Sequence, residues 1–167
     1  MLSGLLKIQN TLANSAKIAI STLFCFVFLQ ACVSAPNKNR APHTLSTLRC
    51  VNAQVHAGKI IGDGHCVSLI KACSGSPDTK FWRPGKRVLN NPALPSGTII
   101  ATFKNARYPN KHGYHAAIYI EHNDEGIWVW DQWQGKSVHK RFIRIRNDGA
   151  SANNSAQAYR VVQLSGR

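Results

Sequence analysis

Three residues of this sequence have side chains that together could carry out nucleophilic catalysis: Cys66, His115 and Asp131. A cysteine thiolate is a nucleophile, an imidazole can keep the thiol ionised, and a carboxylate can fix the tautomer of the imidazole. Each residue also has a simpler interpretation. The cysteine could be a small buried core residue, the histidine could lie at the rim of a sheet, and the carboxylate could pair with one of the many basic side chains. The choice depends on the elements that position them.

Cys66 falls at the start of a predicted helix. Four residues have the i, i+3, i+4, i+7 spacing of one helical face, namely Cys66, Leu69, Ile70 and Cys73. Asp63 is the expected N-cap, which would make Cys66 about the third helical residue, and Gly75 is expected to end the helix. The positive end of the helix dipole favours a thiolate at this position, and the backbone N–H of Cys66 could donate to an oxyanion.

Strand-like segments follow Gly85. Five β-rich stretches cover residues 98–103, 115–121, 127–133, 138–145 and 158–164. Turn residues 122–126 join the second stretch to the third and predict a hairpin. One helix followed by several antiparallel strands is typical of an α+β domain.

The predicted hairpin would bring His115 and Asp131 together. The numbers of paired residues should sum to about 248, so that the two side chains share a face and lie opposite each other or one diagonal apart. A slip of one residue would place them on opposite faces. The pattern therefore predicts that His115 and Asp131 act as base and orienting group for Cys66.

Three short motifs resemble those of the papain-like cell-wall hydrolases: residues 64–67 (Gly-His-Cys-Val), 113–119 (Gly-Tyr-His-Ala-Ala-Ile-Tyr) and 129–133 (Val-Trp-Asp-Gln-Trp). That superfamily includes the NlpC-type endopeptidases, the CHAP amidases and the amidase effectors of type VI secretion. The resemblance covers residues 58–145 and extends to the Trp-Arg-Pro-Gly segment at 82–85. It implies a papain-like fold, with Cys66 as nucleophile, His115 as base and Asp131 as the orienting residue.

The resemblance also implies a reaction and a partner, which is cleavage of peptidoglycan amide bonds within stem peptides or between muramic acid and L-Ala. The expected substrate-binding residues are Trp82, Arg83 and Trp133, although half-buried packing in the sheet is the alternative for the tryptophans. We expect a monomer without cofactor or metal. A zinc site built on the His-x-x-His spacing of residues 112–115 is disfavoured, because such spacing is common by chance. A non-catalytic lipoprotein that binds cell-wall peptides is the alternative function.

Cysteine pairing in the domain is constrained by the helix. Cys66 and Cys73 lie roughly 10 Å apart along a helix, whereas a disulfide needs Cα atoms within about 7 Å. Either Cys50–Cys73 or Cys50–Cys66 pairs, or no disulfide forms. Cys50–Cys73 is preferred, and it would leave Cys66 free.

Residues 1–31 have the features of a secretory leader, since two lysines and no acidic residue accompany an apolar run at 18–28. The run is shorter than the roughly 20 residues of a membrane span. Its end, Leu-Gln-Ala-Cys, resembles a bacterial lipobox and predicts a lipid on Cys32. The alternative is cleavage after Ala35, which the following Pro36 disfavours. Residues 32–46 are then a tether, and residues 47–167 are the domain.

The charge of the chain indicates an anionic partner. The sequence has 21 Lys and Arg against 7 Asp and Glu, for a net charge of +14. A leader would place this charge in the bacterial cell envelope, at the periplasm or cell surface, where peptidoglycan and lipid head groups are available and nucleic acid is scarce. We therefore expect membrane anchoring through the lipid and no nucleic-acid binding. A leader is unusual for a type VI effector, and the sequence identifies no inhibitor or immunity protein.

Overall fold

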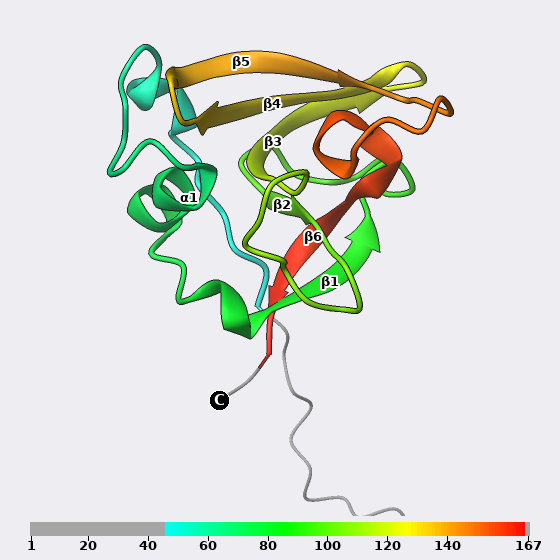
Figure 1. The fold of residues 1–167 in the computed structure, drawn as a ribbon, viewed down its shortest axis with the longest axis horizontal. Helices are drawn as coiled ribbons and strands as arrows, with labels where there is room; N and C mark the ends of the chain where they lie inside the picture. The colour runs from blue at the N-terminus through cyan, green and yellow to red at the C-terminus, as the bar shows by residue number, and fades with distance from the viewer. Residues whose placement is uncertain (1–45, 166–167) are drawn as a thin grey trace, which may run out of the picture. The chain divides into compact units, whose positions relative to one another are not determined.

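A computed structural model describes residues 46–165 of the chain (Figure 1). Cys32 and the predicted leader lie outside the described residues. In the described part, one α-helix, α1 (Cys66–Ser74), accompanies a six-stranded antiparallel sheet. The strands are β1 (Trp82–Arg87), β2 (Ile99–Thr102), β3 (Ala116–Asn123), β4 (Gly126–Trp133), β5 (Lys136–Arg144) and β6 (Tyr159–Leu164), in the spatial order β1-β6-β2-β3-β4-β5. Four short 3₁₀ helices complete the structure: Ala53–His56, Thr79–Phe81, Ala152–Asn154 and Ala156–Ala158.

A mostly antiparallel sheet with one α-helix agrees with the predicted α+β class. The five predicted strands appear as β2 to β6 with shifts of a few residues at their ends. Strand β1 was not predicted, because Pro84 and Gly85 interrupt its pattern. Both residues are tolerated because β1 lies at an edge of the sheet. Gly85 also packs so closely against β6 that an added Cβ would lie 2.9 Å from the side chain of Gln163.

Helix α1 begins later than predicted. Its N-cap is His65, and Cys66 is its first residue, so the expectation that Asp63 is the N-cap is wrong. Positive φ angles at Gly62 and Gly64 turn the chain just before the helix. The Asp63 carboxylate instead accepts hydrogen bonds from the backbone N–H of His65, at 3.0 Å, and from the hydroxyl of Ser68. The helix ends as predicted, with Gly75 in the left-handed conformation.

Apolar side chains are buried on both faces of the sheet. On one face, α1 packs Leu69 and Ile70 beside strand residues such as Ile99 and Ile118. The opposite face is covered by loops and short helices, and it buries a second cluster that includes Val88, Ile100, Tyr119, Val129 and Val161. Helix α1 lies beside one end of β3 and β4 (Figure 1). The N-terminus of the helix is thereby held close to the strand ends that carry polar residues.

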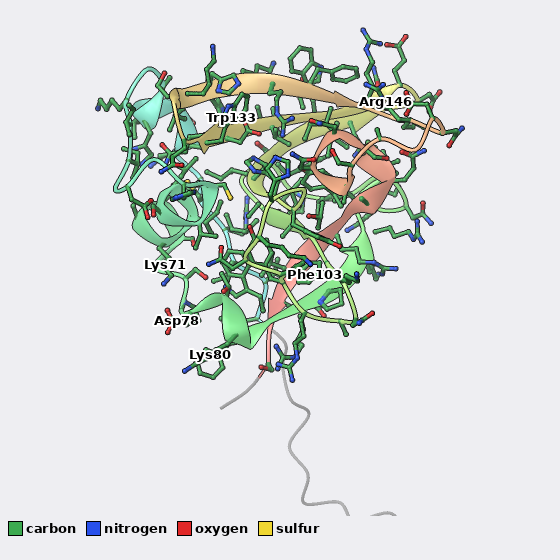
Figure 2. The ribbon with its side chains drawn as sticks, viewed as in Figure 1. Lys71, Asp78, Lys80, Phe103, Trp133 and Arg146 are labelled. Carbon is green, nitrogen blue, oxygen red and sulfur yellow. A yellow bond between two sulfur atoms is a disulfide. The ribbon has the colours of Figure 1, made fainter. Side chains whose placement is uncertain are left out.

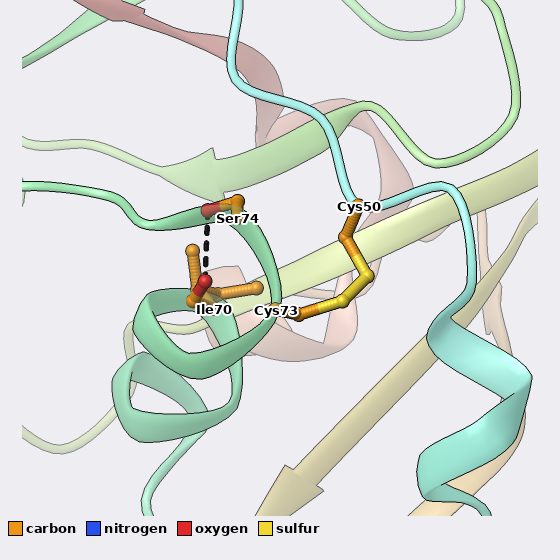
Figure 3. Close-up of a disulfide and its surroundings, with 4 residues drawn as sticks. All are labelled: Cys50, Ile70, Cys73 and Ser74. Atoms are coloured by element: carbon orange, nitrogen blue, oxygen red, sulfur yellow. Dashed lines mark hydrogen bonds between the residues drawn. A yellow bond between two sulfur atoms is a disulfide. The ribbon is translucent and has the colours of Figure 1, made fainter.

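A disulfide fixes the other end of α1. It joins Cys73, in the last turn of the helix, to Cys50, with the two Cα atoms 5.4 Å apart (Figure 3). Cys50 is itself anchored, because its backbone N–H donates to the carbonyl of Gly97 at 2.7 Å. This is the preferred pairing of the sequence analysis. Cys66 is the one cysteine of residues 46–165 outside a disulfide.

Among residues 46–165, no helix is both long enough and apolar enough to span a bilayer.

Candidate active site

The structure brings Cys66, His115 and Asp131 to one place from three elements. Cys66 begins α1, His115 immediately precedes β3, and Asp131 lies near the end of β4. The β3–β4 pairs Ile118–Trp130 and Tyr119–Val129 have the register predicted for the hairpin, with His115 and Asp131 one diagonal apart. A bulge beyond Tyr119 shifts the register, but it lies on the far side of these pairs.

The ring of His115 is held from two sides. Its Nε2 lies 2.9 Å from Oδ2 of Asp131, a carboxylate that is fully buried. The backbone N–H of His115 donates to Oγ1 of Thr102 at 2.9 Å, and its carbonyl accepts from the backbone N–H of Thr102. The bonds to Thr102 fix the backbone, the bond to Asp131 orients the ring, and the other ring nitrogen, Nδ1, is left for Cys66.

Cys66 and His115 change each other's ionisation. Burial alone would raise the pKa of the Cys66 thiol, but a hydrogen bond and the positive charge of His115 outweigh it and hold the pKa below its usual value. Burial alone would lower the pKa of His115, but the hydrogen bond to Asp131 and the sulfur of Cys66 raise it to about 9. The pair therefore favours a thiolate beside an imidazolium, the reactive form of a nucleophilic cysteine.

Tyr108 is a further polar group at the thiol. Its hydroxyl lies 3.5 Å from Sγ of Cys66, and its ring packs against Trp82 and Phe103. Burial and the negative charge of Cys66 raise the pKa of Tyr108, so the hydroxyl stays protonated and able to donate. No sequence pattern predicted this residue, because a tyrosine in a loop carries no periodic signal.

Asp131 is also paired with a basic side chain. The Nε and Nη2 atoms of Arg141, on β5, both lie 2.8 Å from Oδ2. The other oxygen, Oδ1, has no hydrogen-bond partner within residues 46–165, although Nε2 of His139 is 3.8 Å away. Asp131 is therefore both a carboxylate paired with an arginine and the partner of His115, so both interpretations of this residue are correct.

Cys66 and His115 border a cleft of about 870 Å³, and Asp131 lies buried behind His115. Its walls come from the turn before α1, the loop before β3, the end of β4 and the loop at 153–154. Trp133, labelled in Figure 2, is 40 % exposed at the end of β4 and lines this cleft, and its contact with substrate stays a prediction. Within residues 46–165 no cluster of three metal-ligating side chains is found.

Two of the predicted substrate-binding residues lie elsewhere. Trp82 is fully buried in the core, and its indole N–H donates to Oγ of Ser76 at 2.8 Å, so the expectation that it contacts substrate is wrong. The guanidinium of Arg83 donates to the carbonyls of Lys80 and Trp82, and the residue does not line the cleft. Both lie on edge strand β1. The Trp-Arg-Pro-Gly pattern of this strand does not predict that its tryptophan is buried in the core.

The sequence model of the family described as domesticated amidase effector 2 matches residues 41–162. The chain belongs to this family. The type VI secretion amidase effector 2 protein of Salmonella typhi is 38% identical over 117 residues, which are 62% of this chain and 88% of that protein. The domesticated amidase effector 2 of Ixodes scapularis is 39% identical over 100 residues, 58% of this chain and 69% of that protein. A solved structure of a type 6 secretion amidase effector 2 superposes with a TM-score of 0.63 and 36% identity, over 71% of this chain and 96% of that one.

Membership in the amidase effector family supports amide hydrolysis as the activity. The matched segment, residues 41–162, contains Cys66, His115 and Asp131 together with Tyr108 and Arg141. The comparisons name the family and the class of activity, whereas the roles of these residues are inferred from their geometry.

Proposed function

We propose that this chain is a cysteine amidase with a papain-like domain that hydrolyses amide bonds of peptidoglycan through an acyl-enzyme. One observation carries the proposal. The thiol of Cys66 and the ring of His115 lie together at one cleft, with Cys66 as the first residue of a helix, and the ring is bonded to the buried carboxylate of Asp131 behind it. A papain-like arrangement has this form, with a nucleophile at a helix N-terminus and its base on an antiparallel sheet.

Acylation of Cys66 is the first half of the reaction. The thiolate attacks the carbonyl carbon of the scissile amide, and a C–S bond forms as the carbonyl oxygen becomes an oxyanion. The backbone N–H of Cys66 is free to donate to that oxyanion, because the first residues of a helix have no partner for this group within the helix. The hydroxyl of Tyr108, 3.5 Å from Sγ, is a second donor at this point. The imidazolium of His115 then protonates the leaving amine as the C–N bond breaks.

Deacylation restores the enzyme. Neutral His115 takes a proton from a water molecule, which attacks the thioester, and the acid product leaves as the C–S bond breaks. The proton taken from the water regenerates the thiolate–imidazolium pair. Asp131 keeps the ring of His115 in one orientation through both halves, since its Oδ2 accepts from Nε2.

The charges of the cleft support peptidoglycan as the substrate. Its lining includes the basic side chains of Lys111 and Arg141, while Asp63 is its one acidic lining residue. The Asp63 carboxylate is already bonded to His65 and Ser68. Stem peptides of peptidoglycan carry free carboxylates, which a basic wall attracts.

Incubation of the full-length chain with purified sacculi tests the proposal. We expect wild type to release soluble fragments with new amine and carboxyl ends, identified by mass spectrometry of the muropeptides, and Cys66→Ala to release none. Lys71→Ala is a matched control, because Lys71 lies on the same helix with its side chain at the surface, paired with Asp78 (Figure 2). The proposal fails if wild type and Cys66→Ala release the same products, or if neither releases any.

We also propose the lipid anchor at Cys32 and hence a location in the bacterial cell envelope. The support is the lipobox-like sequence before Cys32. Cys32→Ser should abolish labelling of the chain by palmitate in a bacterial host, and labelling that persists in this variant would exclude the anchor.

A further inference from the structure

Arg141 is the most fully engaged basic side chain near the cleft. Both Nε and Nη2 contact Oδ2 of Asp131 at 2.8 Å. Nη1 donates to Oδ1 of Asn154 at 3.3 Å, and Nη2 donates to the carbonyl of Asn153 at 3.4 Å. The guanidinium lies 5.3 Å from the centre of the Trp133 ring. One side chain thus joins four groups from two other segments of the chain, which would otherwise be able to move independently.

The other basic residues of β5 have no such role. Lys140 and Arg144 lie on the opposite face of the strand with their side chains 46% and 68% exposed, against 18% for Arg141. Their partners are the exposed carboxylates Glu121 and Glu125, at 3.8 and 4.0 Å. Exposed ion pairs of this kind contribute little. The basic run 140–146 therefore contains one residue whose contacts reach the active site.

We propose that Arg141 is a positioning residue for the amidase reaction, which holds Asp131 against His115 and ties that carboxylate to the cleft walls at Trp133 and Asn153–Asn154. The inference rests on the proposed function. It adds a fourth side chain to the thiol, imidazole and carboxylate.

The position of Asp131 requires such a partner. A carboxylate buried without compensation is costly, and Oδ1 already lacks a hydrogen bond within residues 46–165. Without Arg141 the bond to His115 would be the one side-chain hydrogen bond that the carboxylate keeps within residues 46–165, and the carboxylate would be held less firmly against the ring. Arg141 also carries charge into the site. Its nitrogens and Nε2 of His115 contact the same oxygen, so they lie within about 6 Å of each other.

The charge of Arg141 affects the protonation of His115 with a defined sign. The titratable and charged groups facing this cluster are Cys66 on α1, Tyr108 in the loop between β2 and β3, Asp131 on β4, Arg141 and His139 on β5, and Tyr159 on β6. Removing a neighbouring positive charge favours the imidazolium and raises the pKa of His115. Removing Arg141 should therefore move the alkaline limb of activity, where the imidazolium loses its proton, to higher pH.

Three variants of the full-length chain test this inference: Arg141→Met, Arg141→Lys and, as the matched control on the same strand, Arg144→Met. On soluble muropeptides we expect Arg141→Met to lower kcat by about tenfold or more and to shift the alkaline limb of kcat/KM upward by about one pH unit. Arg141→Lys keeps the positive charge, so its alkaline limb of kcat/KM should lie near the wild-type pH, and its kcat should lie between those of Arg141→Met and wild type. Arg144→Met should match wild type in both.

An NMR titration of the His115 ring gives a readout that does not depend on catalysis. The ring should titrate at higher pH in Arg141→Met than in wild type, and near the wild-type pH in Arg141→Lys. An unchanged limb and titration in Arg141→Met would overturn the inference, as would a loss confined to KM, which would make Arg141 a substrate contact. If wild type releases no product at all, the proposed function fails, while the titration still decides whether Arg141 acts on His115. If Arg141→Met does not fold, Arg141→Lys is compared with wild type instead. Because this variant keeps the positive charge, its alkaline limb of kcat/KM should stay at the wild-type pH, and a limb that moves would overturn the inference.

Discussion

Removing the disulfide should destabilise the domain by an amount that its loop length predicts. The bond joins Cys50 and Cys73 across a sequence separation of 23 residues. Loop-closure entropy for such a loop is about 11 cal/mol/K, which corresponds to about 3.4 kcal/mol at 25 °C. The double variant Cys50→Ala/Cys73→Ala should therefore lose about 3.4 kcal/mol of its free energy of unfolding, because the unfolded chain regains this freedom.

The same loss can be expressed as a melting temperature. A folded region of roughly 120 residues has an unfolding entropy of about 250 cal/mol/K near its midpoint, so the expected fall in Tm is about 14 °C. Activity at 25 °C should change much less than stability. The disulfide anchors the C-terminal end of α1, whereas Cys66 lies at the N-terminal end, which has its own contacts to β4.

Thermal and urea unfolding followed by circular dichroism under non-reducing conditions measures the loss. A Cys66→Ala background prevents thiol exchange and serves as the reference, and reduction of this reference with dithiothreitol should reproduce the effect of the double variant. A loss below about 1 kcal/mol would refute the loop-entropy reasoning. Activity is compared in chains that keep Cys66, where a large fall in kcat of the double variant at 25 °C would show that the disulfide also sets the geometry of the thiol.

Three further substitutions separate the roles assigned at the cleft. Asp131→Asn removes the charge that raises the pKa of His115 to about 9, so the alkaline limb of kcat/KM should move to lower pH; an unmoved limb would exclude the pairing. Tyr108→Phe removes one oxyanion donor and should lower kcat by about 100-fold with little change in KM, whereas an unchanged kcat in steady-state assays would rule out that role. Gln132→Leu leaves three partly buried backbone groups without their partner and should cost about 2 kcal/mol in urea unfolding; the exposed Gln134→Leu is its control, and equal stability of the two would contradict the prediction.

Local pattern was enough to predict the elements that carry the thiol, the imidazole and the carboxylate. Helix α1 follows from an apolar repeat and a glycine stop, both of which act within about ten residues. At the turn Asn123 pairs with Gly126, and the bulge between Tyr119 and Glu121 then shifts the register by one residue, so that Ile118 pairs with Trp130 as expected. Once the register was set, the approach of His115 to Asp131 was a consequence of strand geometry, and no long-range information was needed.

Residues whose position depends on distant parts of the chain could not be predicted. Trp82 pairs with Leu164 across an edge of the sheet, and its burial depends on the return of β6 from the end of the chain. Tyr108 reaches Cys66 from a loop 42 residues away. Arg141 has the same residue type as its exposed neighbour Arg144, and only the alternation of β5 against β4 decides which of them faces Asp131.

Strand β4 gives the site a common reference for nucleophile and base. Successive residues of a strand point to opposite faces of the sheet, so the side chains of Asp131 and Gln132 lie on different faces. Asp131 bonds to His115 on one face, while Gln132 on the other accepts from the backbone N–H of Ile61 and donates to the carbonyls of Ile61 and His65. His65 directly precedes Cys66, so a displacement of β4 would carry the base and the start of α1 together. Motion of the sheet therefore changes the distance between thiol and imidazole little. Acyl transfer requires this, because its catalytic groups must keep their relative positions closely.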